Sequence, residues 1–228
     1  MPKLAANLSW IYQEVPLLQR FGAAAAHGFK AVEILFPYEA PAADIAAELK
    51  KHKLTQALFN LPPGDWSKGE RGIGALPGRE AEFAAALDKA LDYAKVLECR
   101  TLHVMSGMIV PGADKVAMHR TFVSNLKKAC DRTAKSGLTL VLEPINHRDI
   151  PGYFTNTTTQ VMSAMMNSLR RRCLSLRMPT TSTRSIPMRN TIAASTAFGM
   201  GASNAVANIA TSRTVTDIVR FASWVRPL

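Results

Sequence analysis

Short runs of β-forming residues alternate with longer amphipathic stretches through the first 166 residues. The short runs cover residues 4–8, 31–35, 55–60, 101–105 and 139–143, and the amphipathic stretches cover residues 16–27, 42–51, 79–97, 115–136 and 156–166. Glycine follows two of these stretches, at Gly28 and Gly137, as a signal that ends a helix. Repeated strand–helix order builds β-α-β units around a parallel sheet, because each helix covers one face of the sheet. The pattern predicts an α/β fold with five recognisable βα units.

The pattern ends after Met166. Residues 1–166 carry 19 Lys and Arg against 16 Asp and Glu, whereas residues 167–228 carry nine Arg, no Lys and one acidic residue, Asp217. Most of the net charge of +11 therefore belongs to the tail. We divide the chain into βα units over residues 1–166 and an atypical Arg-rich tail over residues 167–228, which either joins the same domain or is disordered.

The distribution of apolar residues and cysteines excludes several classes of protein. The N-terminus lacks the apolar core of a signal peptide, and no run approaches the roughly 20 apolar residues of a membrane helix. Cys99, Cys130 and Cys173 are scattered without a C-x-x-C spacing, which favours neither a disulfide framework nor a zinc site. The sequence predicts a cytoplasmic protein that contacts no membrane.

Polar side chains occur where several predicted strands end. Catalytic groups of an α/β barrel stand at the C-terminal ends of its strands and in the loops that follow. Glu143 ends an apolar strand and can exchange a proton or ligate a divalent cation, although a carboxylate there can also be merely solvated or ion-paired. His103, late in its strand, can hydrogen-bond a substrate oxygen, and a satisfied core histidine is the alternative. Asn7, at the end of the first strand, is a candidate for substrate binding.

The segment from residue 60 to residue 74 is rich in glycine and carries two basic side chains. It could cradle a phosphate, but it lacks the G-x-x-x-x-G-K-[ST] order of a phosphate-binding loop. A lid that carries Trp66 and Arg71 over an anionic substrate fits the residues better, since Arg binds a carboxylate through two parallel hydrogen bonds. The alternative is a solvated loop that Trp66 pins by packing.

Several long motifs follow one another along the first 166 residues. They are AANL at 5–8, VEILFPY at 32–38, FNLPPGDW at 59–66, GERG at 69–72, EPIN at 143–146, DIPGYF at 149–154 and NTT at 156–158. In these residues the chain resembles hydroxypyruvate isomerase and its close relatives such as 2-oxo-tetronate isomerase, which are xylose-isomerase-like barrels. The resemblance covers roughly residues 2–166 and implies a (β/α)8 TIM barrel.

The resemblance implies an isomerase that interconverts hydroxypyruvate and tartronate semialdehyde. Two glutamates would move a proton through an enediolate, and a divalent metal, Mg²⁺ by resemblance, would stabilise the developing negative oxygen. Glu143 matches the first of these glutamates and the first metal ligand. We assign the binding of a small hydroxy-oxo acid to Asn7, Trp66, Arg71 and His103. A homo-oligomer is compatible with this interpretation.

The other members of the family's site have no counterpart after Met166. They are an Asp in an Asp-x-Tyr-His strand end, a Gln on a later strand and a second catalytic Glu. We hypothesise that the chain beyond about residue 167 is translated in a shifted reading frame. Reading the third base of each codon with the first two of the next permits Ala-Asp-Asp-Ile-Tyr over residues 178–183 and His-Glu-Pro-Asp-Gly over residues 210–215. Both resemble the missing motifs, and they occur in one frame and in the expected order. The chain as written would therefore lack part of its active site, and its activity is left open.

Two alternatives stay open. The first keeps the enzyme but changes the substrate to 2-oxo-tetronate, which nothing in these residues excludes. The second is a binding module for nucleic acid or another anion, which the Arg-rich tail would favour. The Arg residues of the tail form no helical stripe and have only Phe198, Phe221 and Trp224 as aromatic companions, so we expect no nucleic-acid partner.

Overall fold

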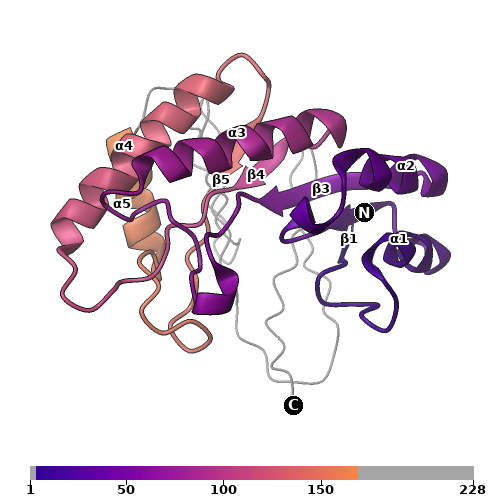
Figure 1. Ribbon diagram of the computed structural model, residues 1–228, viewed down its shortest axis with the longest axis horizontal. Coiled ribbons are helices and arrows are strands. Elements are labelled where there is room, and N and C mark those ends of the chain that lie inside the picture. The colour runs from indigo at the N-terminus through magenta and orange to yellow at the C-terminus, as the bar shows by residue number, and fades with distance from the viewer. Residues whose placement is uncertain (1–3, 169–228) are drawn as a thin grey trace, which may run out of the picture. The chain divides into compact units, whose positions relative to one another are not determined.

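The computed structural model describes residues 4–168. In this part of the chain five strands alternate with five α-helices (Figure 1). The strands are β1 (Ala5–Asn7), β2 (Ala31–Glu33), β3 (Thr55–Asn60), β4 (Thr101–His103) and β5 (Thr139–Val141). The helices are α1 (Leu17–Ala26), α2 (Ala42–His52), α3 (Glu80–Val96), α4 (Lys115–Thr133) and α5 (Thr158–Ser168), with short 3-10 helices η1 (Pro37–Glu39) and η2 (Trp66–Lys68). The α/β class and the five predicted βα units are confirmed, whereas the predicted tail lies, apart from its first two residues, outside the described residues.

Four of the five strands are shorter than the sequence predicts. β4 ends at His103 and β5 ends at Val141, each two residues before the predicted end. Val104 N still donates a hydrogen bond to Val141 O at 2.9 Å, but at Met105 the backbone bonds to the loop after β3, since Gly74 N donates to Met105 O at 3.2 Å. Glu143 therefore lies two residues past the end of β5, at the start of the following loop.

The described chain divides into two compact units, and the first comprises residues 4–60 and 91–100. Its strands β1, β2 and β3 pair in parallel in chain order, with Asn7 opposite Glu33. Helices α1 and α2 of this unit lie side by side (Figure 1). Its fully buried apolar side chains include Phe21, Val32, Ile34, Ile45 and Leu58. Burial of each such side chain stabilises the unit by about 1.5–3 kcal/mol.

The second unit comprises residues 61–90 and 101–168 of the described chain. Its strands β4 and β5 pair in parallel, with His103 opposite Val141. Helices α4 and α5 lie side by side (Figure 1), and Asp114 caps α4 by accepting a hydrogen bond from a backbone N–H of its first turn. The buried apolar side chains of this unit include Met118, Phe122, Leu126, Leu140 and Val161. Helix α3 begins in this unit and ends in the first.

Isolated backbone bridges join three loops of the second unit. The loop after β3 pairs with the loop after β4 at Gly72 and Ser106, and the loop after β4 pairs with the loop after β5 at Met108 and Tyr153. Glycine is required at the first contact, because a Cβ at Gly72 would lie 2.4 Å from the Cβ of Met105. All three loops follow the C-terminal ends of strands, where barrel enzymes carry their active sites.

Replacing Gly72 by Ala is expected to destabilise the protein much more than the same change at Gly69. Both glycines have a positive φ, 107° and 85°, which costs another residue roughly 1–2 kcal/mol. The Cβ position at Gly69 has no heavy atom within 4 Å, whereas that at Gly72 lies 2.6 Å from Met105 O. This close approach adds about 1–3 kcal/mol of overpacking. Urea unfolding followed by circular dichroism measures the difference, and equal losses in the two variants would contradict the close approach.

Candidate active site

Glu143 and His103 lie at the carboxyl ends of the two strands of the second unit. Glu143 is 6% exposed and His103 is 2% exposed. His103 is the last residue of β4 and pairs with Val141, and Glu143 follows Val141 by two residues. The structure therefore places the predicted catalytic carboxylate and the predicted substrate-binding histidine at the C-terminal ends of two paired strands.

The loops after β4 and β5 share a buried polar network. The hydroxyl of the fully buried Tyr153 accepts a hydrogen bond from Ser106 N at 2.9 Å. Ser106 Oγ and Thr155 Oγ1 lie 2.9 Å apart. Thr155 O accepts a hydrogen bond from Ile145 N at 3.1 Å, which ties the segment that carries Tyr153 to the segment that carries Glu143.

Electrostatic coupling links Tyr153 to Glu143. Burial raises the pKa of Tyr153 to about 12, hydrogen bonds from Ser106 oppose the rise, and the negative charge of Glu143 adds to it. Tyr153 is therefore a neutral phenol at neutral pH, and a neutral phenol is a hydrogen-bond donor. Sequence reasoning missed this network, because its signal, a large aromatic residue inside the DIPGYF motif, does not reveal which distant residues surround it.

Tyr153 is expected to make the free energy of unfolding fall as the pH rises above about 10. A tyrosine in the unfolded chain loses its proton near pH 10, about where model peptides do, whereas buried Tyr153 keeps its proton up to about 12. Between these values the folded state binds more protons than the unfolded state, so stability is lost, by about 2–3 kcal/mol in all. The unfolding free energy of wild type and Tyr153→Phe, measured across this range, checks the prediction. Parallel pH profiles would contradict it, whatever the offset caused by the lost hydrogen bond.

Trp66 and Arg71, the two residues of the predicted lid, lie together in the loop after β3. The guanidinium carbon of Arg71 lies 3.7 Å from the centre of the Trp66 ring. Arg71 Nη1 donates to the backbone carbonyl oxygens of Trp66, at 3.1 Å, and Glu70, at 2.7 Å. Burial lowers the pKa of Arg71 from its ordinary value. The loop thus presents a flat, half-buried cation held against an aromatic ring.

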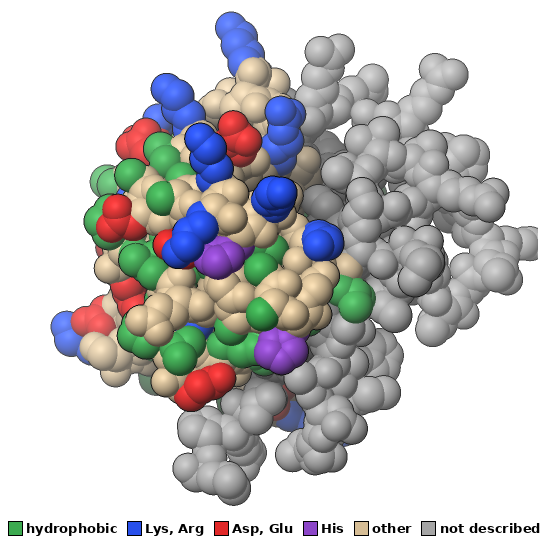
Figure 2. Space-filling view, turned by 90° about the vertical axis from the view of Figure 1, so that its right-hand side faces the viewer, with side chains coloured by type: hydrophobic (Ala, Val, Ile, Leu, Met, Phe, Trp, Pro, Cys, Tyr) green, Lys and Arg blue, Asp and Glu red, His purple; other side chains and the backbone are tan. Residues whose placement is uncertain are grey.

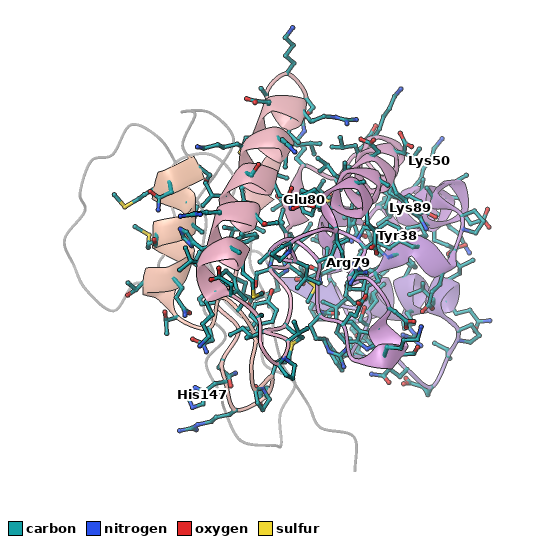
Figure 3. All side chains as sticks on the ribbon, turned by 60° about the vertical axis from the view of Figure 1, so that its left-hand side comes forward. Tyr38, Lys50, Arg79, Glu80, Lys89 and His147 are labelled. Atoms are coloured by element: carbon teal, nitrogen blue, oxygen red, sulfur yellow. The ribbon has the colours of Figure 1, made fainter. Side chains whose placement is uncertain are left out.

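Two acidic side chains that sequence reasoning missed hold this loop in shape. Asp65 accepts hydrogen bonds from the backbone N–H of Ser67 at 3.1 Å and of Lys68 at 3.2 Å, which closes the turn of η2. Glu70 forms an ion pair with Arg79, whose hydrogen bond lowers the pKa of the Glu70 carboxyl. Arg79 lies just before α3 (Figure 3). The Asp–x–Ser turn is a recognisable sequence signal, whereas the spacing of Glu70 and Arg79 is not.

Asn7, predicted to bind substrate, belongs to the first unit, and the other predicted site residues belong to the second. Asn7 is 4% exposed, and its Oδ1 accepts a hydrogen bond from Ser9 N at 3.0 Å. Its Nδ2 is buried and has no hydrogen-bond partner among residues 4–168. A buried amide donor of this kind suits a ligand oxygen, because buried polar groups are nearly always hydrogen-bonded.

The described residues do not form a complete metal site. Among residues 4–168, no group of three or more His, Cys, Asp or Glu side chains is placed to hold a metal ion. Glu143 offers one carboxylate, whereas Mg²⁺ prefers about six oxygen ligands, some of them water. His147 is exposed on the loop after β5 and points outward (Figure 3). A divalent metal therefore finds no complete set of ligands among the described residues, and further ligands would have to come from outside them.

Comparison with known proteins decides the family. Residues 21–175, which are more than half of the chain, match the family described as xylose isomerase-like TIM barrel. The chain belongs to the xylose isomerase-like TIM barrel family. This TIM barrel protein is 53% identical over 156 residues to 2-oxo-tetronate isomerase of Cupriavidus necator, a match that covers 68% of this chain and 60% of that protein. It is 40% identical over 162 residues to hydroxypyruvate isomerase of Escherichia coli, covering 71% of this chain and 63% of that protein.

A solved structure agrees with the family assignment. A Brucella melitensis protein described as an AP endonuclease of family 2 is similar to the TIM barrel chain with a TM-score of 0.73 and 48% identity, covering 77% of this chain and 68% of that one. The predicted TIM barrel fold, with five βα units described, is confirmed. The chain spans about 60% of the length of the curated isomerases it matches. None of the helices described here has the length and apolar character needed to cross a membrane.

Proposed function

We propose that this TIM barrel protein is, by lineage, an isomerase that interconverts hydroxypyruvate and tartronate semialdehyde, with Glu143 as a proton-transfer group. The observation that carries the proposal is the setting of Glu143, which is buried, follows the strand that pairs with the strand of His103, and is electrostatically coupled to the Tyr153 hydroxyl. Relatives named hydroxypyruvate isomerase and 2-oxo-tetronate isomerase support the reaction class.

The reaction moves one proton between neighbouring carbon atoms. The Glu143 carboxylate would take a proton from the hydroxymethyl carbon of hydroxypyruvate and leave an enediolate. His103 would donate a hydrogen bond to the enediolate oxygen that carries the negative charge. Return of a proton to the middle carbon, with transfer of the hydroxyl proton between the two oxygens, gives tartronate semialdehyde, so the step balances without an oxidant or reductant. Tyr153 stays a neutral phenol and would add no second negative charge near the Glu143 carboxylate.

A second acidic group is needed to return a proton to the middle carbon of the substrate. The family pattern gives this role to a second Glu, which has no counterpart in the chain as written. We therefore propose that the shifted frame beyond about residue 167 encodes this Glu, together with the further ligands that would join Glu143 in holding a divalent metal such as Mg²⁺. Incubation of the frame-restored protein with hydroxypyruvate in D2O, followed by proton NMR, tests the proposal. A lack of both conversion and deuterium incorporation would contradict it.

A second substrate, 2-oxo-tetronate, is favoured by the comparison with Cupriavidus necator. Identity to the 2-oxo-tetronate isomerase of that organism is 53%, against 40% to the hydroxypyruvate isomerase of Escherichia coli. Both acids carry a carboxylate, an adjacent carbonyl and a hydroxylated carbon, so the same proton transfer serves both. The ratio of kcat/KM for the two acids, measured on the frame-restored protein, decides between them.

A cytoplasmic location, a homo-oligomeric state and the lack of a nucleic-acid partner stay predictions. Residues 4–168 carry 18 Lys and Arg against 16 Asp and Glu. Basic and acidic side chains both occur on the face seen in Figure 2. This near balance leaves the described residues an excess of only two positive charges, which is small for an anion-binding module, and most of the Arg-rich tail that favours such a module lies outside them.

A further inference from the structure

Arg71 carries a half-buried positive charge, and no Asp or Glu among residues 4–168 forms an ion pair with it. Both acidic side chains of its loop are engaged elsewhere: Asp65 closes the turn of η2, and Glu70 pairs with Arg79. Arg71 itself hydrogen-bonds only backbone carbonyl oxygens among the described residues. Because charges that are partly removed from water in proteins are usually paired, a half-buried guanidinium in this position is suited to an external anion.

The N–H donors of Arg71 that remain unused in the described part of the chain, on Nε and Nη2, share one edge of the guanidinium group. Both of its hydrogen bonds come from Nη1, and neither Nε nor Nη2 has a hydrogen-bond partner among residues 4–168. Stacking on Trp66 fixes the plane of the guanidinium, and it leaves the N–H groups free in that plane. Two parallel N–H groups on one edge match the two oxygens of a carboxylate.

The backbone of the same loop argues against a phosphate as the anion. Phosphate-binding loops use several free backbone N–H groups. Here Gly69 N donates to Trp66 O at 3.1 Å, Gly72 N donates to Pro63 O at 2.8 Å, and Gly74 N is bonded to the loop after β4. Three of the four glycine amides in residues 60–74 are therefore consumed within the protein.

We infer that Arg71, stacked on Trp66, binds the carboxylate of the hydroxy-oxo acid through its Nε and Nη2 edge. The identity of the acid rests on the proposed function, whereas binding itself requires no turnover. Glu70 and Arg79 act as positioning residues, because their ion pair keeps the Glu70 carboxylate away from Arg71. The site takes small planar carboxylates in preference to phosphate.

Binding of glycerate to the full present chain tests the inference. Glycerate and glycerol differ only by a carboxylate in place of a hydroxymethyl group, and neither absorbs where tryptophan does. Calorimetry gives the affinity, and the emission of Trp66, identified by its loss in Trp66→Phe, gives the location. We expect saturable binding of glycerate with a change in Trp66 emission, and no such change with glycerol or with inorganic phosphate at equal ionic strength.

Three variants make the test specific. Arg71→Lys keeps the charge but loses the two-pronged geometry and is expected to weaken glycerate binding roughly 10- to 100-fold. Arg71→Met should abolish it. Lys68→Met removes a basic residue of the same loop whose Nζ pairs with Asp65 at 3.1 Å, and it should change the affinity less than about two-fold. Circular dichroism melting curves confirm that each variant is folded.

Several results would overturn the inference. They are the absence of glycerate binding to the wild type, equal binding of glycerol or phosphate, and undiminished binding in folded Arg71→Met. The proposed function fails separately. If the frame-restored protein binds glycerate through Arg71 but converts neither acid, the isomerase proposal falls and the carboxylate site stands. If it turns over substrate with an unchanged KM in Arg71→Met, the carboxylate site falls and the isomerase stands.

Discussion

Restoring the alternate reading frame after about residue 167 is expected to raise the rate of hydroxypyruvate conversion by roughly a thousand-fold or more over that of the present chain. Glu143 can take a proton from one carbon, but the group that returns it to the other carbon is absent from the present frame. A positioned acid or base contributes about 10²–10⁴ in rate, and the missing metal ligands add to the deficit. Initial rates with and without Mg²⁺, measured on both proteins at equal concentration, give the ratio.

The nucleotide sequence supplies an independent control for this prediction. The alternate frame should be open beyond about residue 167 and should encode the Asp-x-Tyr and His-Glu-Pro-Asp motifs. An alternate frame interrupted by stop codons, or lacking these motifs, would contradict the hypothesis. So would a present chain that unfolds cooperatively and converts hydroxypyruvate in a metal-dependent manner. The frame-restored protein should also bind a divalent cation more tightly than the present chain, since residues 4–168 alone hold no cluster of three ligands.

Glu143→Gln in the frame-restored protein is expected to lower kcat by about 10³–10⁴, because an amide cannot accept the substrate proton. Gln has nearly the shape of Glu, so the buried position should remain filled and the fold intact. The pH dependence of stability should also change, because the Glu143 charge contributes to the raised pKa of Tyr153. Without that charge Tyr153 should lose its proton at a lower pH, which ultraviolet titration of the tyrosines measures.

Glu39→Gln serves as the matched control for this variant. Glu39 is an exposed carboxylate on η1 of the first unit, so its loss should leave kcat within about two-fold. Activity of Glu143→Gln close to that of the control would remove Glu143 from the mechanism. An unchanged Tyr153 titration would show that the two groups are not coupled.

The predicted strands and helices agree with the structure where the local pattern of apolar residues governs it. Strand β3 begins and ends at the predicted residues. The ends of strands were predicted less well, because there the backbone hydrogen-bonds to another loop rather than to a neighbouring strand. Helix α2 is followed by Lys53 and helix α3 by Glu98 in the left-handed region, at φ 54° and 52°, positions where glycine is the usual signal. No local pattern marks such residues, because packing of the chain that follows selects their conformation.

The βα order and the place of Glu143 after the fifth strand follow from local sequence, because apolar periodicity and the polarity of strand ends involve residues close together in the chain. The sequence also identified Trp66 and Arg71 as members of one loop. The three-dimensional packing was needed to show that Arg71 lies over the Trp66 ring while the neighbouring Glu70 pairs with Arg79. It also decided that Tyr153 meets Ser106, 47 residues away in the chain. Such pairings depend on which loops pack together in three dimensions, and sequence spacing does not record that packing.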